Sequence, residues 1–292
     1  MSLPETLVEW DGLTLYGTRG PGRRTFRTLE GWEGTPDTHA DDENRLQEHG
    51  THDSPEFAGA RFVTVSGAAF SPTERDAILV ELGRTLVLGG PRSVLKDLRI
   101  THAGRVLTAG ARLRRFAPVA DMWGAGAFSW VAQWKCPDPL RYADPVAQST
   151  GFASPGGGLR FPLFTDGLAP VARLDFGLPG TSGRVTLTNT GSAEARPQLT
   201  VLGPVADEGF DVVCVETGER LTYATGVSAG ASVVLDSATG RVLLNGDGDR
   251  SGYLVRAEWF AIPPGASRTI ALIPRGVASA ATMTVTIRPP WW

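Results

Sequence analysis

Residues 30–56 hold the densest group of side chains that could bind a metal ion. The segment carries nine acidic residues, almost no apolar residue and three histidines, His39, His49 and His52. Imidazole and carboxylate groups are ligands for zinc and similar ions, so the composition alone allows a metal site. The spacing matches no ordered site, however, and a flexible loop would lose much entropy on clamping an ion. We therefore favour a solvated, exposed loop or hairpin tip, and expect no metal.

A second pattern with the residue types of a metal site lies at residues 247–258. Its oxygen-bearing residues occupy positions 1, 3, 5 and 12 of a calcium-binding loop, with glycine at position 6. An EF-hand needs a helix on each side, whereas both flanks here alternate as strands do. Asn245-Gly246 between two such runs is a strong hairpin signal. The sequence therefore favours a hairpin turn over a calcium site.

Motifs for catalysis are absent from the sequence. It contains no G-x-S-x-G elbow, no Walker A motif, no G-x-G-x-x-G after a strand and no H-E-x-x-H. A carboxylate pair for glycoside hydrolysis leaves no sequence signature, so a cell-wall hydrolase with an accessory sandwich domain stays an alternative. Of the eight tryptophans, Trp130, Trp134 and Trp259 fall in strand-like runs, where core packing is expected. We predict a protein with no enzyme activity, no catalytic residues and no cofactor.

The composition is that of an ordinary globular protein. Among 292 residues, 41% are apolar, 20% are charged and the net charge is -3, which argues against a protein that grips nucleic acid or an anionic membrane. Cys136 and Cys214 are too few for a disulfide scaffold, and we expect two buried free thiols. Neither a signal peptide nor a membrane span is recognisable, so we expect folding in a reducing cytoplasm.

Period-2 alternation dominates the chain and predicts a mainly β protein. The 36 glycines and 21 prolines indicate many turns. The capping box Ser71-Pro72-Thr73-Glu74 predicts one helix over 72–83, with Ile78, Leu82 and Leu86 on its apolar face. We predict two domains, 1–150 and 151–292, joined by a linker over 143–158. The expected strands are 13–17, 61–65, 112–116, 128–134, 184–188, 199–202, 232–235, 241–244, 253–256, 269–273 and 282–287.

Several stretches resemble the distal tail proteins (Dit) of long-tailed (siphovirus) bacteriophages. In the second half they are Thr188–Gly203, Leu235–Gly246, Trp259–Gly265 and Val285–Trp292. In the first half they are Leu13–Gly17, the capped helix after Val63–Gly67, and Phe128-Ser-Trp130 leading into Asp138–Tyr142. Asn189-Thr-Gly191 and Asn245-Gly246 are interpreted as positive-φ turn residues, and Pro264-Gly265 as a further turn.

The resemblance implies a fold and a structural role. The fold is an N-terminal β-sandwich belt domain with one packed helix, followed by a galectin-like antiparallel β-sandwich. The role is a homohexameric ring at the tail tip of the virion, assembled in the host cytoplasm. Its implied partners are the tail tube protein, the tape-measure protein, the tail-associated hub protein and, in some members, a receptor-binding protein. A carbohydrate-binding module is the alternative, although residues 160–292 contain no histidine for galectin-type sugar binding.

The charge pattern of the first half suggests how such a ring could close. Two basic stretches, Arg19–Arg27 and Arg99–Arg115, flank the acidic segment 30–56. Unconnected solvated faces are the simplest explanation. A ring, however, requires a patch that meets a different patch on the neighbour, and opposite charges favour that register. The candidate inter-subunit residues are Arg23, Arg24, Arg27, Asp41, Asp42, Glu43, Arg112, Arg114 and Arg115.

Overall fold

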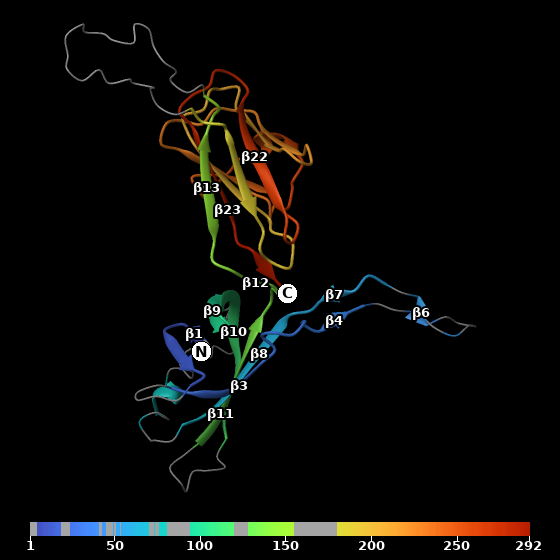
Figure 1. Ribbon diagram of the computed structural model, residues 1–292, viewed down its shortest axis with the longest axis vertical. Coiled ribbons are helices and arrows are strands. Elements are labelled where there is room, and N and C mark those ends of the chain that lie inside the picture. The colour runs from blue at the N-terminus through green and yellow to red at the C-terminus, as the bar shows by residue number, and fades with distance from the viewer. Residues whose placement is uncertain are drawn as a thin grey trace, which may run out of the picture. The chain divides into compact units, whose positions relative to one another are not determined.

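The computed structural model divides the chain into two compact units (Figure 1). Unit 1 contains residues 1–144 and 290–292, and unit 2 contains residues 145–289. The predicted boundary at 150 instead falls inside strand β13 (Val146–Gly151). Hydrogen bonding to a neighbouring strand gives this part of the expected linker regular structure. The structure describes residues 5–18, 24–40, 43–44, 49, 51–52, 54–69, 73, 76–80, 94–119, 128–154 and 180–292.

Unit 1 is built on one antiparallel sheet with the order β2-β1-β9-β10-β11-β8-β3. The long strand β10 joins its two halves, because residues 105–111 pair with β9 and residues 112–119 pair with β11. The short strands β12 and β24 pair with each other, and β12 also pairs with β10. The strands are β1 (Leu7–Trp10), β2 (Leu13–Tyr16), β3 (Phe26–Glu30), β8 (Arg61–Ala69), β9 (Lys96–His102), β10 (Arg105–Val119), β11 (Phe128–Cys136), β12 (Arg141–Tyr142) and β24 (Pro290–Trp291).

The core of unit 1 lies between the two halves of this sheet. Trp10 of β1 packs edge-on against Trp134 of β11, with ring centroids 5.8 Å apart. Both tryptophans are buried, as is Trp130, which confirms the expectation that Trp130 and Trp134 serve packing. The expected helix is confirmed where the structure describes it, at Thr73 and over residues 76–80. Ile78 is its buried anchor, whereas Leu82 and Leu86 lie outside the described residues.

The acidic segment forms a two-stranded ribbon, as the hairpin interpretation predicted. Its strand pairs are β4 (Thr38–His39) with β7 (Phe57–Ala58), and β5 (Glu43–Asn44) with β6 (Thr51–His52). Figure 1 draws this ribbon between β3 and β8, the two strands that its ends continue. Thr38, His39, Glu56 and Phe57 are all exposed.

Unit 2 is a sandwich of two antiparallel sheets, ordered β13-β23-β15-β18-β19-β20 and β14-β22-β16-β17-β21. Alternate residues of both sheets point inward and form a single apolar core. Every strand expected in this half is present, within one or two residues of its predicted bounds. Beyond β13, the strands are β14 (Arg184–Thr188), β15 (Gln198–Leu202), β16 (Phe210–Cys214), β17 (Arg220–Tyr223), β18 (Ser232–Asp236), β19 (Arg241–Leu244), β20 (Gly248–Asp249), β21 (Leu254–Ala257), β22 (Ser267–Pro274) and β23 (Thr282–Ile287).

Two of the three expected turns of unit 2 use positive φ angles, and one does not. Asn245 and Gly246 have φ of 51° and 85°, and Gly265 has φ of 69°. Asn189 and Gly191, by contrast, are not in the positive-φ region, so that interpretation was wrong. The Asn189 side chain holds its turn instead: Nδ2 donates to the carbonyls of Ala193 and Ile262, and Oδ1 accepts from the amide of Gly191.

Candidate assembly interface

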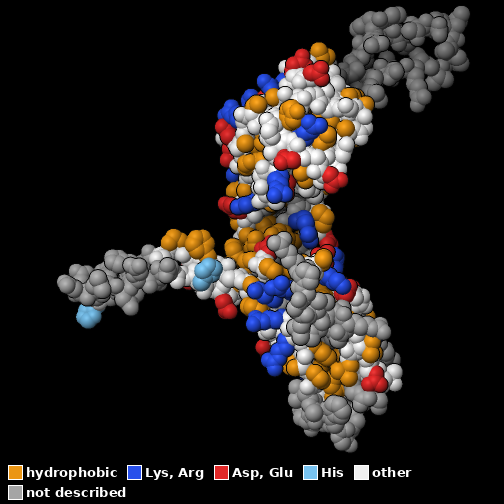
Figure 2. Space-filling model, turned by 180° about the vertical axis from the view of Figure 1, so that it is seen from behind, with side chains coloured by type: hydrophobic (Ala, Val, Ile, Leu, Met, Phe, Trp, Pro, Cys, Tyr) orange, Lys and Arg blue, Asp and Glu red, His pale blue; other side chains and the backbone are white. Residues whose placement is uncertain are grey.

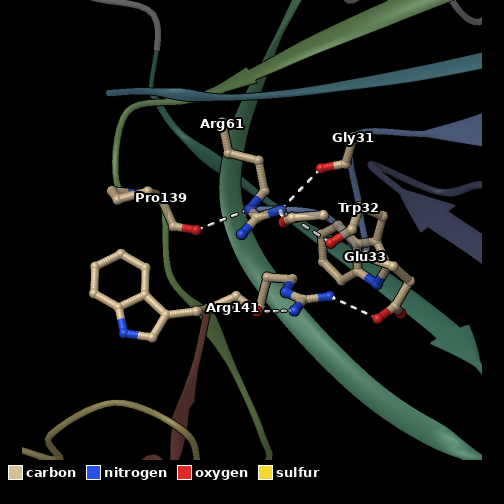
Figure 3. Close-up of polar contacts among 8 residues, drawn as sticks. Gly31, Trp32, Glu33, Arg61, Pro139 and Arg141 are labelled. Atoms are coloured by element: carbon tan, nitrogen blue, oxygen red, sulfur yellow. Dashed lines mark hydrogen bonds and ion pairs between the residues drawn. The ribbon is translucent and has the colours of Figure 1, made fainter. Parts of the chain in front are cut away.

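A buried arginine holds the base of the ribbon. Arg61, the first residue of β8, is only 1% exposed. Its Nη1 atom lies 2.9, 3.0 and 2.7 Å from the carbonyl oxygens of Gly31, Trp32 and Gly34, to which it donates. Its Nε atom donates to the carbonyl of Pro139, in the turn after β11 (Figure 3). One guanidinium therefore ties the segment that leads into the ribbon to a turn that lies 78 residues after Arg61 in the chain.

A second buried arginine extends this cluster to the last strand of the chain. Arg141 pairs through Nη1 with Oε2 of Glu33 at 3.2 Å, and Nη2 donates to the carbonyl of Trp292. Its guanidinium also lies 5.5 Å from the centre of the Trp32 ring. Figure 3 shows the two guanidinium groups converging on the Gly31–Glu33 segment. The ribbon base and the C-terminal end of the chain thus share one polar cluster, built around two buried guanidinium groups.

Burial shifts the ionisation of the groups in this cluster. Desolvation lowers the pKa of the Arg61 guanidinium, and the positive charge of Arg141 lowers it further. Arginine remains charged in proteins, so the backbone carbonyls must compensate the buried charge. Burial also raises the pKa of the nearby Cys136 thiol to about 11, against the opposing effect of Arg61. Cys136 and Cys214 are both free and buried, as expected.

The turn at the ribbon base requires a glycine. Gly31 has φ of +76°, and a Cβ atom there would lie 1.9 Å from the carbonyl oxygen of Phe62. No other residue fits so close to the neighbouring backbone. The glycine lets β3 turn away from β8 and brings the carbonyls of residues 31–34 within reach of Arg61.

The role of Arg61 was not predicted from the sequence, although a signal for it is present. Alternation along β8 places Arg61 in phase with Val63 and Val65, which are both fully buried. A charged residue on the buried face of a strand demands partners. The carbonyls that supply them come from residues remote in sequence, which the local pattern does not reveal.

An exposed basic face is formed by β10 and its neighbours. Arg112, Arg114 and Arg115 are all exposed, although 114 and 115 are consecutive. The register between β10 and β11 shifts between Leu113 and Arg115. Such a bulge breaks the alternation, so two adjacent side chains can both point away from the core. The structure therefore brings together three of the nine candidate interface residues.

The basic face continues onto β11 and β8. Lys135 lies directly opposite Arg112 in the register, and Phe62 lies opposite Lys135. The Arg114 guanidinium is 4.9 Å from the centre of the Phe62 ring, and Lys135 Nζ is 5.9 Å from it. We call Arg112, Arg114, Arg115, Lys135 and Phe62 the basic face. Figure 2 shows Lys and Arg side chains gathered on unit 1 beside the base of the ribbon.

Other arginines of the two basic stretches have partners inside the chain. Arg99 makes a two-pronged contact with Asp144 at 3.0 and 3.1 Å, and Arg105 stacks 4.5 Å from the Trp291 ring. Arg24 is half-buried, Arg27 is exposed, and both have interactions within the chain. Arg19, Arg23, Asp41 and Asp42 lie outside the described residues. Glu43 is described through its backbone, in β5.

The two segments considered as metal sites, residues 30–56 and 247–258, make other contacts in the structure. His39 packs on Phe57, with ring centroids 6.1 Å apart. Residues 243–249 form the β19–β20 hairpin, which confirms the turn expected at Asn245-Gly246. Asp249 Oδ1 accepts from the amide of Ser251, a hydrogen bond that lowers the pKa of Asp249. No group of metal-ligating side chains occurs among the residues that the structure describes. Within the same residues, no helix is long and apolar enough to cross a membrane.

Comparisons with known proteins bear on both units. Residues 190–291 match the family model of the siphovirus-type tail component, C-terminal domain. The fold is similar to that of the Dit protein of phage SPP1, with a TM-score of 0.64 and 14% identity over 98% of this chain and 99% of that one. That crystal structure is described as a paradigm of the hub adsorption apparatus in phages that infect Gram-positive bacteria.

Weaker matches come from the baseplate of phage p2. Chains of its activated conformation, with Ca and with Sr, each give a TM-score of 0.44 and 11% identity over 97% of both chains. No curated protein sequence matches the chain.

Proposed function

We propose that this chain, whose residues 190–291 match the model of the siphovirus-type tail component, C-terminal domain, is the distal tail protein of a long-tailed phage. In this role it has no enzyme activity and serves as a structural part of the tail tip. The observation that carries the proposal is the coincidence of two findings. Residues 190–291 match the family model, and the fold of the SPP1 protein extends over 98% of the chain, including unit 1.

The proposed assembly is a homohexameric ring made by unit 1. The ring would join the tail tube to the tip, in contact with the tube protein, the tape-measure protein and the tail-associated hub protein. Unit 2, a galectin-like sandwich, would carry or dock host-recognition parts such as a receptor-binding protein. Polar side chains on the outer faces of the sandwich support this outward placement. Thr186 meets Thr269 on one sheet and Ser149 meets Thr284 on the other, with all four side chains partly or fully exposed.

The sharpest test combines a measurement in solution with one on particles. Multi-angle light scattering of the purified full chain should give the mass of a ring, against 31.0 kDa for one copy. Antibodies raised against unit 2 should label the tail tip of intact virions in electron micrographs. A protein that stays monomeric at all concentrations and is absent from isolated tails would refute the proposal.

A further inference from the structure

We propose that the basic face of β10, β11 and β8 docks the acidic ribbon of a neighbouring copy of the chain. The inference rests on the proposed ring and names the contact that closes it. It assigns one surface, Arg112, Arg114, Arg115, Lys135 and Phe62, and one occupant, the segment 30–56 of the next subunit.

Within the part of the chain that the structure describes, these cations have no acidic partner. Among the described residues, ion pairs serve Lys96, Arg99, Arg141, Arg220 and Arg256, but none involves Arg112, Arg114, Arg115 or Lys135. Arg112 and Lys135 are directly opposite each other, and like charges in that position destabilise a sheet. An anionic partner would turn this repulsion into attraction.

The bulge in β10 exposes two consecutive arginines. A regular strand would turn either Arg114 or Arg115 toward the core, since successive side chains alternate. The shift between Leu113 and Arg115 exposes both, and it places Arg115 opposite Gln133 on the same face. Bulges often re-aim side chains for function. Here the bulge concentrates positive charge around an aromatic ring.

The acidic ribbon and the basic face are complementary in charge. The segment 30–56 carries nine acidic residues and only one arginine, Arg45. Directly after this segment, strand β7 of the ribbon also exposes an aromatic ring, because Phe57 is 61% exposed beside Glu56. The basic face has the matching composition, with Phe62 between two cations. Arginine suits such a contact because its planar guanidinium group can donate two hydrogen bonds to one carboxylate.

The symmetry of a closed ring also fits a contact between two different patches. A closed ring needs a heterologous interface, in which two different patches of each copy meet. The ribbon and the basic face are two such patches on unit 1. Like-with-like pairing would set cations against cations or acids against acids, which disfavours a two-fold dimer.

The test is a charge swap. In the face variant, Arg112, Arg114 and Arg115 are replaced by Glu; in the ribbon variant, Asp41, Asp42 and Glu43 are replaced by Lys. We define the half-assembly concentration as the protein concentration at which half of the chains are in rings, measured by sedimentation velocity. For each variant alone it should be at least tenfold higher than for the wild-type chain. The two variants mixed, and a chain carrying all six changes, should both recover assembly because opposite charges meet again.

A matched control carries the same change in charge on unit 2, at exposed Arg184, Arg196 and Arg241, each replaced by Glu. This control should assemble like the wild-type chain. The inference is wrong if wild-type rings form and the face variant assembles equally well. It is also wrong if the chain with all six substitutions folds normally but does not recover assembly. In both cases the ring proposal stands. If the wild-type chain forms no ring, the proposed function itself fails.

Discussion

The Nε atom of Arg61 donates a hydrogen bond of 2.8 Å to the carbonyl oxygen of Pro139, and so joins the first residue of β8 to the turn that follows β11. The same side chain serves three further carbonyls, at Gly31, Trp32 and Gly34. The base of the ribbon is therefore fixed by one buried cation and by contacts remote in sequence.

Replacing Arg61 should destabilise unit 1 strongly. Arg61→Met leaves four carbonyls without their donor and should cost about 3–5 kcal/mol in the free energy of unfolding. Arg61→Lys should lose nearly as much, because a single ammonium group lacks the planar fork that serves several acceptors. Urea unfolding followed by tryptophan fluorescence measures the loss. Arg112→Met, at an exposed site, should change stability by no more than about 0.5 kcal/mol; equal effects at both positions would contradict the role of the cluster.

A pair of glycine substitutions separates backbone strain from a steric clash. Gly31 and Gly12 have similar positive φ angles, 76° and 83°, but a Cβ at Gly12 meets nothing within 4 Å. Gly12→Ala should cost about 1 kcal/mol for the left-handed conformation alone. Gly31→Ala must also displace the Phe62 carbonyl, and we expect a loss at least twice as large in the same urea titration. A smaller loss at Gly31 than at Gly12 would mean that the turn relaxes freely.

Asn189 should be essential to unit 2 but not to unit 1. The side chain is fully buried and makes three hydrogen bonds to backbone groups. Asn189→Leu leaves those groups unpaired and should cost about 2–4 kcal/mol. Hydrogen exchange read by mass spectrometry should show faster exchange in unit 2, residues 145–289, only. Equal acceleration in β8 and β11 would show that the two units unfold together.

The raised pKa of Cys136 predicts a loss of stability in alkali. The folded thiol has a pKa of about 11, against an ordinary value of 9.0, so the unfolded chain releases its proton at a lower pH. Stability should be constant below pH 9 and fall between pH 9 and 11, by roughly 2–3 kcal/mol in total. Cys136→Ala should remove this part of the pH dependence in denaturation curves at pH 8 and 11. Identical slopes for both chains would argue against the shift.

Salt should weaken the proposed ring. Raising the ionic strength from about 0.15 M to about 1 M shortens the Debye length from about 8 Å to about 3 Å. Each exposed pair contributes only about 0.2–1 kcal/mol, so the effect depends on several pairs acting together. Sedimentation velocity of the wild-type chain should show a higher half-assembly concentration at high salt. In the face variant, an acidic face meets an acidic ribbon, so high salt should screen the repulsion and lower the half-assembly concentration instead. Wild-type rings that are indifferent to salt would speak against charge pairing.

The sequence by itself determined most strands of unit 2, the Asn245-Gly246 turn and the helix around Ile78. Alternation with a period of two marks β14, β19 and β23 at their observed bounds, because burial of one sheet face is encoded residue by residue. Asn245-Gly246 likewise specifies its turn through local backbone preference.

Contacts between remote segments were decided only by the tertiary structure. The pairing of β24 with β12 returns the end of the chain to unit 1, and no local pattern encodes it. The bulge that exposes both Arg114 and Arg115 depends on the register against β11. The partners of Arg61 come from two separate segments, residues 31–34 and residue 139. Local propensity acts over a few residues, whereas register and buried polar pairing follow from the way in which distant strands pack.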